Sequence, residues 1–71
     1  MKNSFTCTIE KIAGSKFRKF RLTVAVETDI GLFIVEIFEV KTRQRKEYTK
    51  RHLREFYTNI RFVEIDEELE G

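Results

Sequence analysis

The sequence predicts a small α+β domain in which one helix covers one face of a mainly antiparallel sheet. Three stretches in the first part of the chain alternate apolar with polar residues, as half-buried strands do. A segment with apolar residues at helical spacing follows, and a short apolar run comes after it. Together these patterns predict the order β-β-β-α-β, in which the four strands form one sheet and the helix packs against it.

The first two strands are expected in "SFTCTIEKI" and "KFRLTVAVE". In the first stretch Phe5, Cys7 and Ile9 share one side, and polar residues occupy the other. Gly14 and Ser15 then supply residues that are typical of a turn before the second strand. The third strand is expected in "LFIVEIFEVKT", after the turn sequence "TDIG".

The hairpin between the second and third strands has a predicted register. A three-residue loop of Asp29, Ile30 and Gly31, in which the glycine takes a left-handed conformation, pairs Thr28 with Leu32. One face of the hairpin is then apolar except for Glu36, and a shift by one residue would expose that apolar set. The predicted pairs are Val26 with Ile34, Val24 with Glu36, Leu22 with Phe38, Phe20 with Val40, Ala25 with Val35, Thr23 with Ile37 and Arg21 with Glu39.

The helix is expected to begin near Glu47 and to end near Asn59. Thr49, Phe56, Tyr57 and Ile60 all lie within about 60° of Leu53 on a helical projection, so they form one apolar stripe. A start at Arg43 would place Lys46 at the centre of this stripe, and a cation is unfavourable there. The run "RFVEI" then closes the sheet as a short last strand.

The composition indicates one folded domain rather than a disordered chain. The 71 residues are 41% hydrophobic and carry a net charge of only +2, so we expect one domain over residues 1–66 and an acidic, frayed tail over 67–71. One cysteine and one histidine allow neither an internal disulfide nor a zinc set, and no cofactor is indicated. No signal peptide or membrane-spanning stretch is apparent, so the expected location is the cytoplasm.

Two basic runs suggest a ligand that is anionic. Seven cations stand between Lys41 and Arg54 against one acid, Glu47, but the helical part pairs its charges at i, i+4 spacing and is expected to be a solvated face. Continued past Val40, the hairpin register brings Lys19 opposite Lys41, and a phosphate backbone could neutralise both. The nucleic-acid-binding residues expected on this basis are Lys16, Arg18, Lys19, Arg21, Lys41, Arg43, Arg45 and Lys46. The alternative is that these side chains extend into water at a sheet end and serve only solubility.

The sheet face opposite the helix is a second candidate surface. Phe33, Val35 and Ile37 are expected there beside Ala25, and an uncovered apolar patch of this kind usually marks an association surface. A homodimer, an inhibitor of a larger protein or an assembly subunit would use it in that way. Alternatively, curling of the sheet or the tail covers this face.

Catalysis is not expected. Glu36 is the one acid in the inward-facing set, His52 stands at the border of the helical stripe, and Cys7 fits a small core position. No nucleophile, base and acid can be combined from these residues, and no glycine-rich phosphate loop is present. Tyr48 is expected to be exposed, either as an ordinary surface tyrosine or as a contact for a base or a partner.

Overall fold

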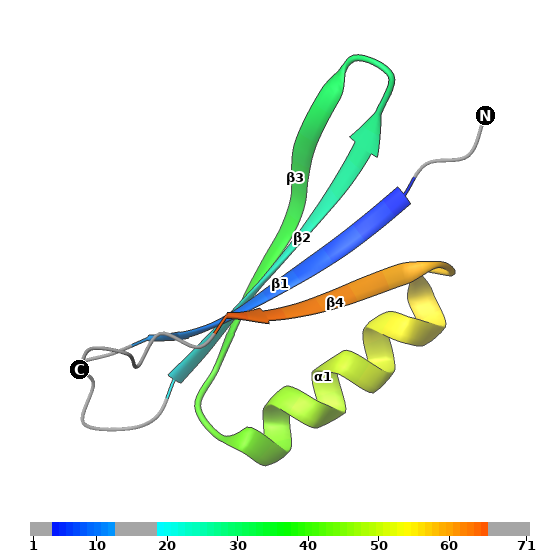
Figure 1. Ribbon diagram of the computed structural model, residues 1–71. Coiled ribbons are helices and arrows are strands. Elements are labelled where there is room, and N and C mark those ends of the chain that lie inside the picture. The colour runs from blue at the N-terminus through cyan, green and yellow to red at the C-terminus, as the bar shows by residue number, and fades with distance from the viewer. Residues whose placement is uncertain (1–3, 13–18, 66–71) are drawn as a thin grey trace.

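The chain forms a four-stranded sheet with one helix packed on one face, which confirms the predicted α+β class (Figure 1). The computed structural model describes residues 4–12 and 19–65, so the predicted turn at Gly14 and Ser15 and the acidic tail lie outside the described residues. The elements are β1 (Ser4–Ile12), β2 (Lys19–Thr28), β3 (Gly31–Val40), α1 (Arg43–Phe56) and β4 (Ile60–Ile65).

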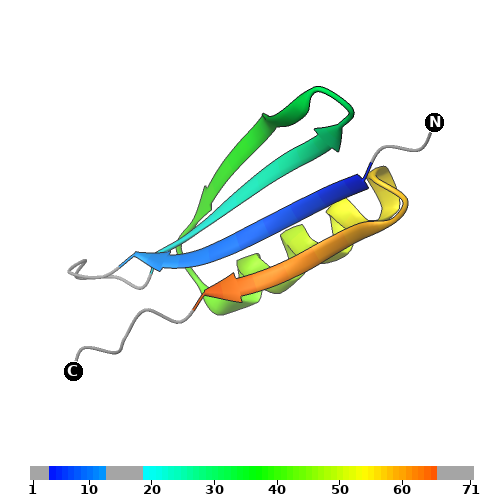
Figure 2. The same cartoon turned by 45° about the horizontal axis from the view of Figure 1, so that its top comes forward.

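The strands lie side by side in the order β3-β2-β1-β4 (Figure 2). Strands β1, β2 and β3 pair antiparallel, whereas β4 returns through α1 and pairs parallel with β1. A parallel neighbour needs a crossover connection, and α1 supplies it. Strands β3 and β4 are therefore the two edges of the sheet.

The hairpin register is confirmed in its lower half, at the open end, and wrong in its upper half, towards the loop. From Phe20 with Val40 to Val24 with Glu36 the predicted pairs are present. A β-bulge follows between Val24 and Ala25, and beyond it Ala25 pairs with Ile34 instead of Val35. The loop contains two residues rather than three, since Thr28 pairs with Gly31. A bulge inserts one residue into one strand, so both the loop length and the upper register change together.

Helix α1 begins one turn earlier than predicted. Thr42 is its N-cap and its hydroxyl accepts a hydrogen bond from the Arg45 amide at 3.0 Å, so the predicted start near Glu47 is wrong. The helix ends at Phe56, before the predicted Asn59, and the Tyr57 amide donates to the Leu53 carbonyl at 2.8 Å. Asn59 takes a left-handed conformation, with φ 64°, in the turn that leads into β4.

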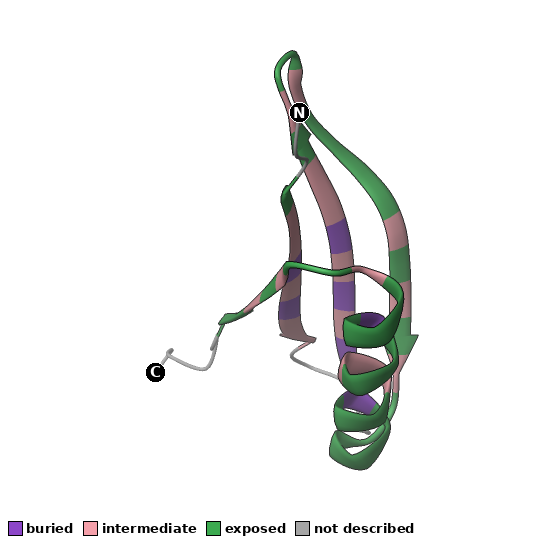
Figure 3. Cartoon of the chain, turned by 90° about the vertical axis from the view of Figure 1, so that its right-hand side faces the viewer, coloured by how far each residue is buried: buried purple, intermediate pink, exposed green. Residues whose placement is uncertain are grey.

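The core is small and lies between α1 and the sheet (Figure 3). Leu53 is the one buried apolar residue of α1, and it packs with five buried residues of the sheet. Those five are Cys7, Ile9, Phe20, Leu22 and Val24. Phe56, which was predicted on the apolar stripe, is 69% exposed, whereas Tyr57 beside it is partly buried against the core.

The closed end of the β2–β3 hairpin projects past α1 (Figure 1). Side chains near this end consequently remain exposed on both faces of the hairpin, including Leu32 and Phe33. We call the face of the sheet turned away from α1 the outer face. Within the described residues, no helix is long and apolar enough to cross a membrane.

Candidate functional site

The predicted basic residues lie mainly at one end of the molecule, where β2 begins, β3 ends and α1 starts (Figure 1). Lys19 opens β2, Lys41 lies in the bend after β3, and Arg43 and Arg45 lie in the first turn of α1. Lys16 and Arg18 are outside the described residues. The described part of the chain thus has cations from separate elements near one end.

The pairing that was expected to unite them is wrong in detail. The β2–β3 ladder stops at Phe20 with Val40, so Lys19 does not pair with Lys41. Arg43 cannot continue the strand, because Thr42 already caps the helix. Lys11 joins the group instead, since it stands opposite Phe20 on β1 and, with Arg43, lines a hollow at this end. The sequence analysis missed Lys11, although it is two residues from Ile9 in a strand and therefore lies on the same face, the helix side.

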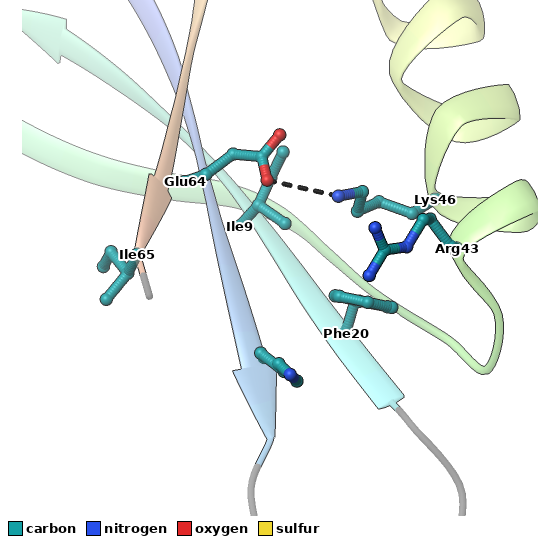
Figure 4. Close-up of a pocket in the computed structure, with 7 residues that line it drawn as sticks. Ile9, Phe20, Arg43, Lys46, Glu64 and Ile65 are labelled. Atoms are coloured by element: carbon teal, nitrogen blue, oxygen red, sulfur yellow. Dashed lines mark hydrogen bonds and ion pairs between the residues drawn. The ribbon is translucent and has the colours of Figure 1, made fainter. Parts of the chain in front are cut away.

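Lys46 belongs to the interior rather than to the surface. Its side chain is only 8% exposed, and its Nζ donates a hydrogen bond of 3.1 Å to Glu64 Oε1 (Figure 4). The ammonium group also lies 4.9 Å from the centre of the Phe20 ring, a cation–π distance. A buried cation is tolerated where it is both paired and hydrogen-bonded. Lys46 is therefore removed from the surface that could meet an anion.

Glu64 holds a second lysine as well. Lys50 Nζ donates to Glu64 Oε2 at 3.1 Å, and Lys50 also lies over the Phe62 ring at 5.4 Å. The hydrogen bond from Lys46 lowers the pKa of the Glu64 carboxyl; burial opposes this, and Lys50 adds to the lowering. Glu64 thus stays ionised and ties β4 to the first half of α1.

Arg21 is also engaged within the chain. Its guanidinium lies 3.1 Å from Glu39 on the neighbouring strand, which confirms the predicted cross-strand pair. The side chain is still 43% exposed, so the pair is solvated and of small energetic value. Two of the eight predicted residues, Arg21 and Lys46, therefore already have acidic partners.

Five cationic side chains form what we call the basic end: Lys11, Lys19, Lys41, Arg43 and Arg45. Within residues 4–12 and 19–65, no acidic side chain forms an ion pair with any of them. The first turn of α1 contains no acid, although the positive end of a helix dipole favours negative charge. Arg45 lies 5.6 Å from the ring of Tyr48, whose predicted exposure is confirmed. Cations gathered at a helix start repel one another, and an external anion would relieve that repulsion.

A hollow of about 390 Å³ opens beside the basic end, between the start of α1 and the sheet (Figure 4). Arg43 lines it from the start of α1, and Lys46 and Glu64, joined by their ion pair, line it from α1 and β4. Its lining residues are Ile9, Lys11, Phe20, Arg43, Lys46, Glu64 and Ile65. Three cations against one acid give the hollow a positive balance.

The outer face exposes apolar side chains among charged ones, and its membership differs from the prediction. Ile37 is exposed there as expected, at 56%, whereas Val35, at 43%, is the residue that the bulge leaves out of the ladder. Phe33 is displaced by the bulge: it pairs with Val26 and stands on the helix side, so its predicted place on the outer face is wrong. Val63 and Ile65 of β4 are exposed and alternate with Phe62 and Glu64 on the other side. No described residue outside the sheet covers this face.

The remaining candidates have ordinary surroundings. Burial raises the pKa of the Cys7 thiol to about 11, with a small opposing effect of Lys50, so the group is a poor nucleophile. Burial also raises the pKa of the Tyr57 hydroxyl, and the nearby Glu36 carboxylate adds to this. His52 is exposed beside Phe56. Among the residues described, no three His, Cys, Asp or Glu side chains lie close enough to share a metal ion.

Comparisons with protein-family models, with curated proteins and with solved structures gave no match for this chain. Functional inference therefore depends on the two surfaces themselves, the basic end and the outer face.

Proposed function

We propose that the chain is a small non-catalytic module that binds nucleic acid through the phosphate backbone at its basic end. The observation that carries this proposal is the gathering of five cations, from β1, β2, α1 and the bend after β3, at one end of the molecule. Backbone contacts of this kind neutralise phosphates and release condensed counterions, and they do not read sequence. Exposed Tyr48, next to Arg45, offers a stacking surface for an unpaired base.

Titration of labelled single-stranded and double-stranded oligonucleotides at several salt concentrations tests the proposal. With about four or five phosphate contacts, affinity for a single strand should fall by roughly fifty- to a hundredfold between about 50 and 200 mM salt. No binding at low salt, or an affinity that is indifferent to salt, would contradict it.

A matched pair of variants locates the contact. The double variant Lys41→Gln, Arg43→Gln removes two charges at the basic end and should reduce the salt slope for a single strand by about 1.4. The control Arg51→Gln, Arg61→Gln removes the same charge from exposed positions elsewhere, on the body of α1 and at the start of β4. If the control loses as much affinity as the first variant, the basic end is not the binding surface.

The second candidate function is protein–protein interaction through the outer face, as a homodimer, an inhibitor or an assembly subunit. The exposure of Ile34, Ile37, Val63 and Ile65 on one side of the sheet favours it. Light scattering of the wild type and of Val35→Lys tests this candidate. A chain that is monomeric at all concentrations and captures no partner, with or without the substitution, would count against it.

A further inference from the structure

The outer face is ordered into rows that cross the sheet. Strand pairing places Ile37, Thr23, Thr8 and Val63 side by side on β3, β2, β1 and β4. We call these four residues the apolar row, because it has a large aliphatic side chain at each end and two threonines between them and carries no charge. Directly opposed residues in a sheet project to the same face, so the row lies on one surface.

A charged row lies next to the apolar row, towards the basic end. It consists of Glu39, Arg21, Glu10 and Ile65 on the same four strands. The signs of its three charges alternate, and only Arg21 with Glu39 is joined by an ion pair, at 3.1 Å. Arg21 and Glu10 occupy the two central strands, on either side of the midline of the sheet.

We propose that the outer face binds the outer face of a second copy of this chain, about a two-fold axis parallel to the strands. This inference depends on the second candidate function and names its partner. The axis passes between β1 and β2, so each β2 lies over β1 of the partner subunit and each β3 lies over β4 of the partner subunit. Stacked sheets with nearly aligned strands are a common packing, about 10 Å apart.

The charges select this axis. It sets Arg21 against Glu10 of the partner subunit and Glu10 against Arg21 of the partner subunit, which gives two opposite-charge contacts. It also sets Ile37 against Val63 of the partner subunit, twice. A two-fold axis across the strands would instead bring Arg21 over Ala25 of the partner subunit, where it meets no acid of that subunit and keeps only its Glu39 partner within the chain. The charged row is thus complementary to itself in this orientation.

Because the axis is parallel to the strands, the strands of both subunits run in the same directions. The two basic ends therefore lie at the same end of the dimer. A polyanion long enough to span them would meet both at once, and the second contact would form at high effective concentration. The dimer and the proposed nucleic-acid binding would then strengthen each other, although neither requires the other.

Reciprocal charge reversal tests the inference on the full chain, by sedimentation equilibrium or light scattering. The wild type should reach about twice the 8.5 kDa mass of one chain as concentration rises. Arg21→Glu alone and Glu10→Arg alone should each dissociate at least about tenfold more readily, because like charges then face each other twice. An equimolar mixture of the two variants should recover the dimer, since each reversed residue meets its complement only in the mixed pair.

Several controls make the outcome decisive. Circular dichroism and thermal melting of each variant show whether it is folded, and the mixture provides a rescue that a folding defect would not allow. Arg51→Glu, on the exposed side of α1, should leave the mass unchanged. A monomer at every concentration, or a dimer equally stable in the wild type, the single variants and the mixture, would overturn the proposal. If Val35→Lys abolishes association and the mixture shows no recovery, the outer face still binds a partner but not in this arrangement. The oligonucleotide titration reports on the basic end separately.

Discussion

The basic end and the outer face differ in how they behave in water without a partner. The cations of the basic end keep their charged groups hydrated, so an empty basic end costs the fold little beyond mutual repulsion. The outer face exposes aliphatic side chains, and each square ångström of apolar area that becomes buried gains about 25 cal/mol. The basic end therefore needs a ligand only for function, whereas covering the outer face would also stabilise a domain with a very small core.

The two surfaces also depend on different elements. Arg43 and Arg45 are carried by α1, which the core retains through Leu53, whereas the outer face is made by the strands alone. Perturbing the helix should therefore affect the basic end first, and perturbing β3 should affect the outer face first. The following predictions use this difference, and the largest expected effect comes first.

Leu53→Ala should produce the largest loss. This side chain is 1% exposed and is the one buried apolar group of α1, so its truncation should lower the free energy of unfolding by about 2–5 kcal/mol. Urea denaturation followed by circular dichroism measures the change. Phe56→Ala on the same helix is the control, because its ring is 69% exposed and its removal should cost within about 0.5 kcal/mol. Equal losses in the two variants would mean that Leu53 does not anchor α1.

Glu64→Gln should have the next largest effect on stability and, of the two surfaces, should change only the basic end. It leaves the ammonium of Lys46 buried without its closest carboxylate, and Glu47, at 3.7 Å, compensates only in part. We expect a loss of about 1–3 kcal/mol in the free energy of unfolding. Removal of a negative charge near the basic end should also raise affinity for a polyanion, while the dimer mass stays as in the wild type.

Lys46→Met is the matched variant for Glu64→Gln. It replaces the buried cation by an apolar side chain of similar length, so stability should change by less than about 1 kcal/mol in either direction. Denaturation of both variants in parallel separates the cost of an unpaired charge from the value of the pair. A larger loss for Lys46→Met than for Glu64→Gln would show that the ion pair itself stabilises the fold.

The smallest expected effect is a loss of stability at acid pH. The folded-state pKa of Glu64 is lowered, so its contribution to stability is present above the unfolded-state value and is lost as pH falls through the folded-state value. The wild type should therefore lose stability below about pH 4.3, the ordinary glutamate value, more steeply than Glu64→Gln does. Thermal melting over a series of acid buffers measures both slopes. Identical slopes would mean that Glu64 does not carry this dependence.

Sequence patterns predicted the element types and their order, because periodicity in apolar residues reports which side of each element is buried. They also predicted the lower hairpin register, where Arg21 faces Glu39 and Phe20 faces Val40. The upper register could not be predicted in the same way. "GLFIVEI" is apolar at five of seven positions, so moving one residue between strand and bulge leaves an equally apolar pattern on either face.

Lys46 shows most clearly what the sequence determined and what only the tertiary structure decided. The helical spacing by itself determined that Lys46 falls on the buried stripe if the helix begins at Arg43. Whether such a helix forms depended on a counter-charge eighteen residues later in the chain, and parallel pairing of β4 with β1 brings Glu64 to that place. Local periodicity carries no information about a partner that only chain topology supplies. Tertiary structure therefore decided which basic residues are buried and which lie at the basic end, because a buried charge is stable only beside its partner.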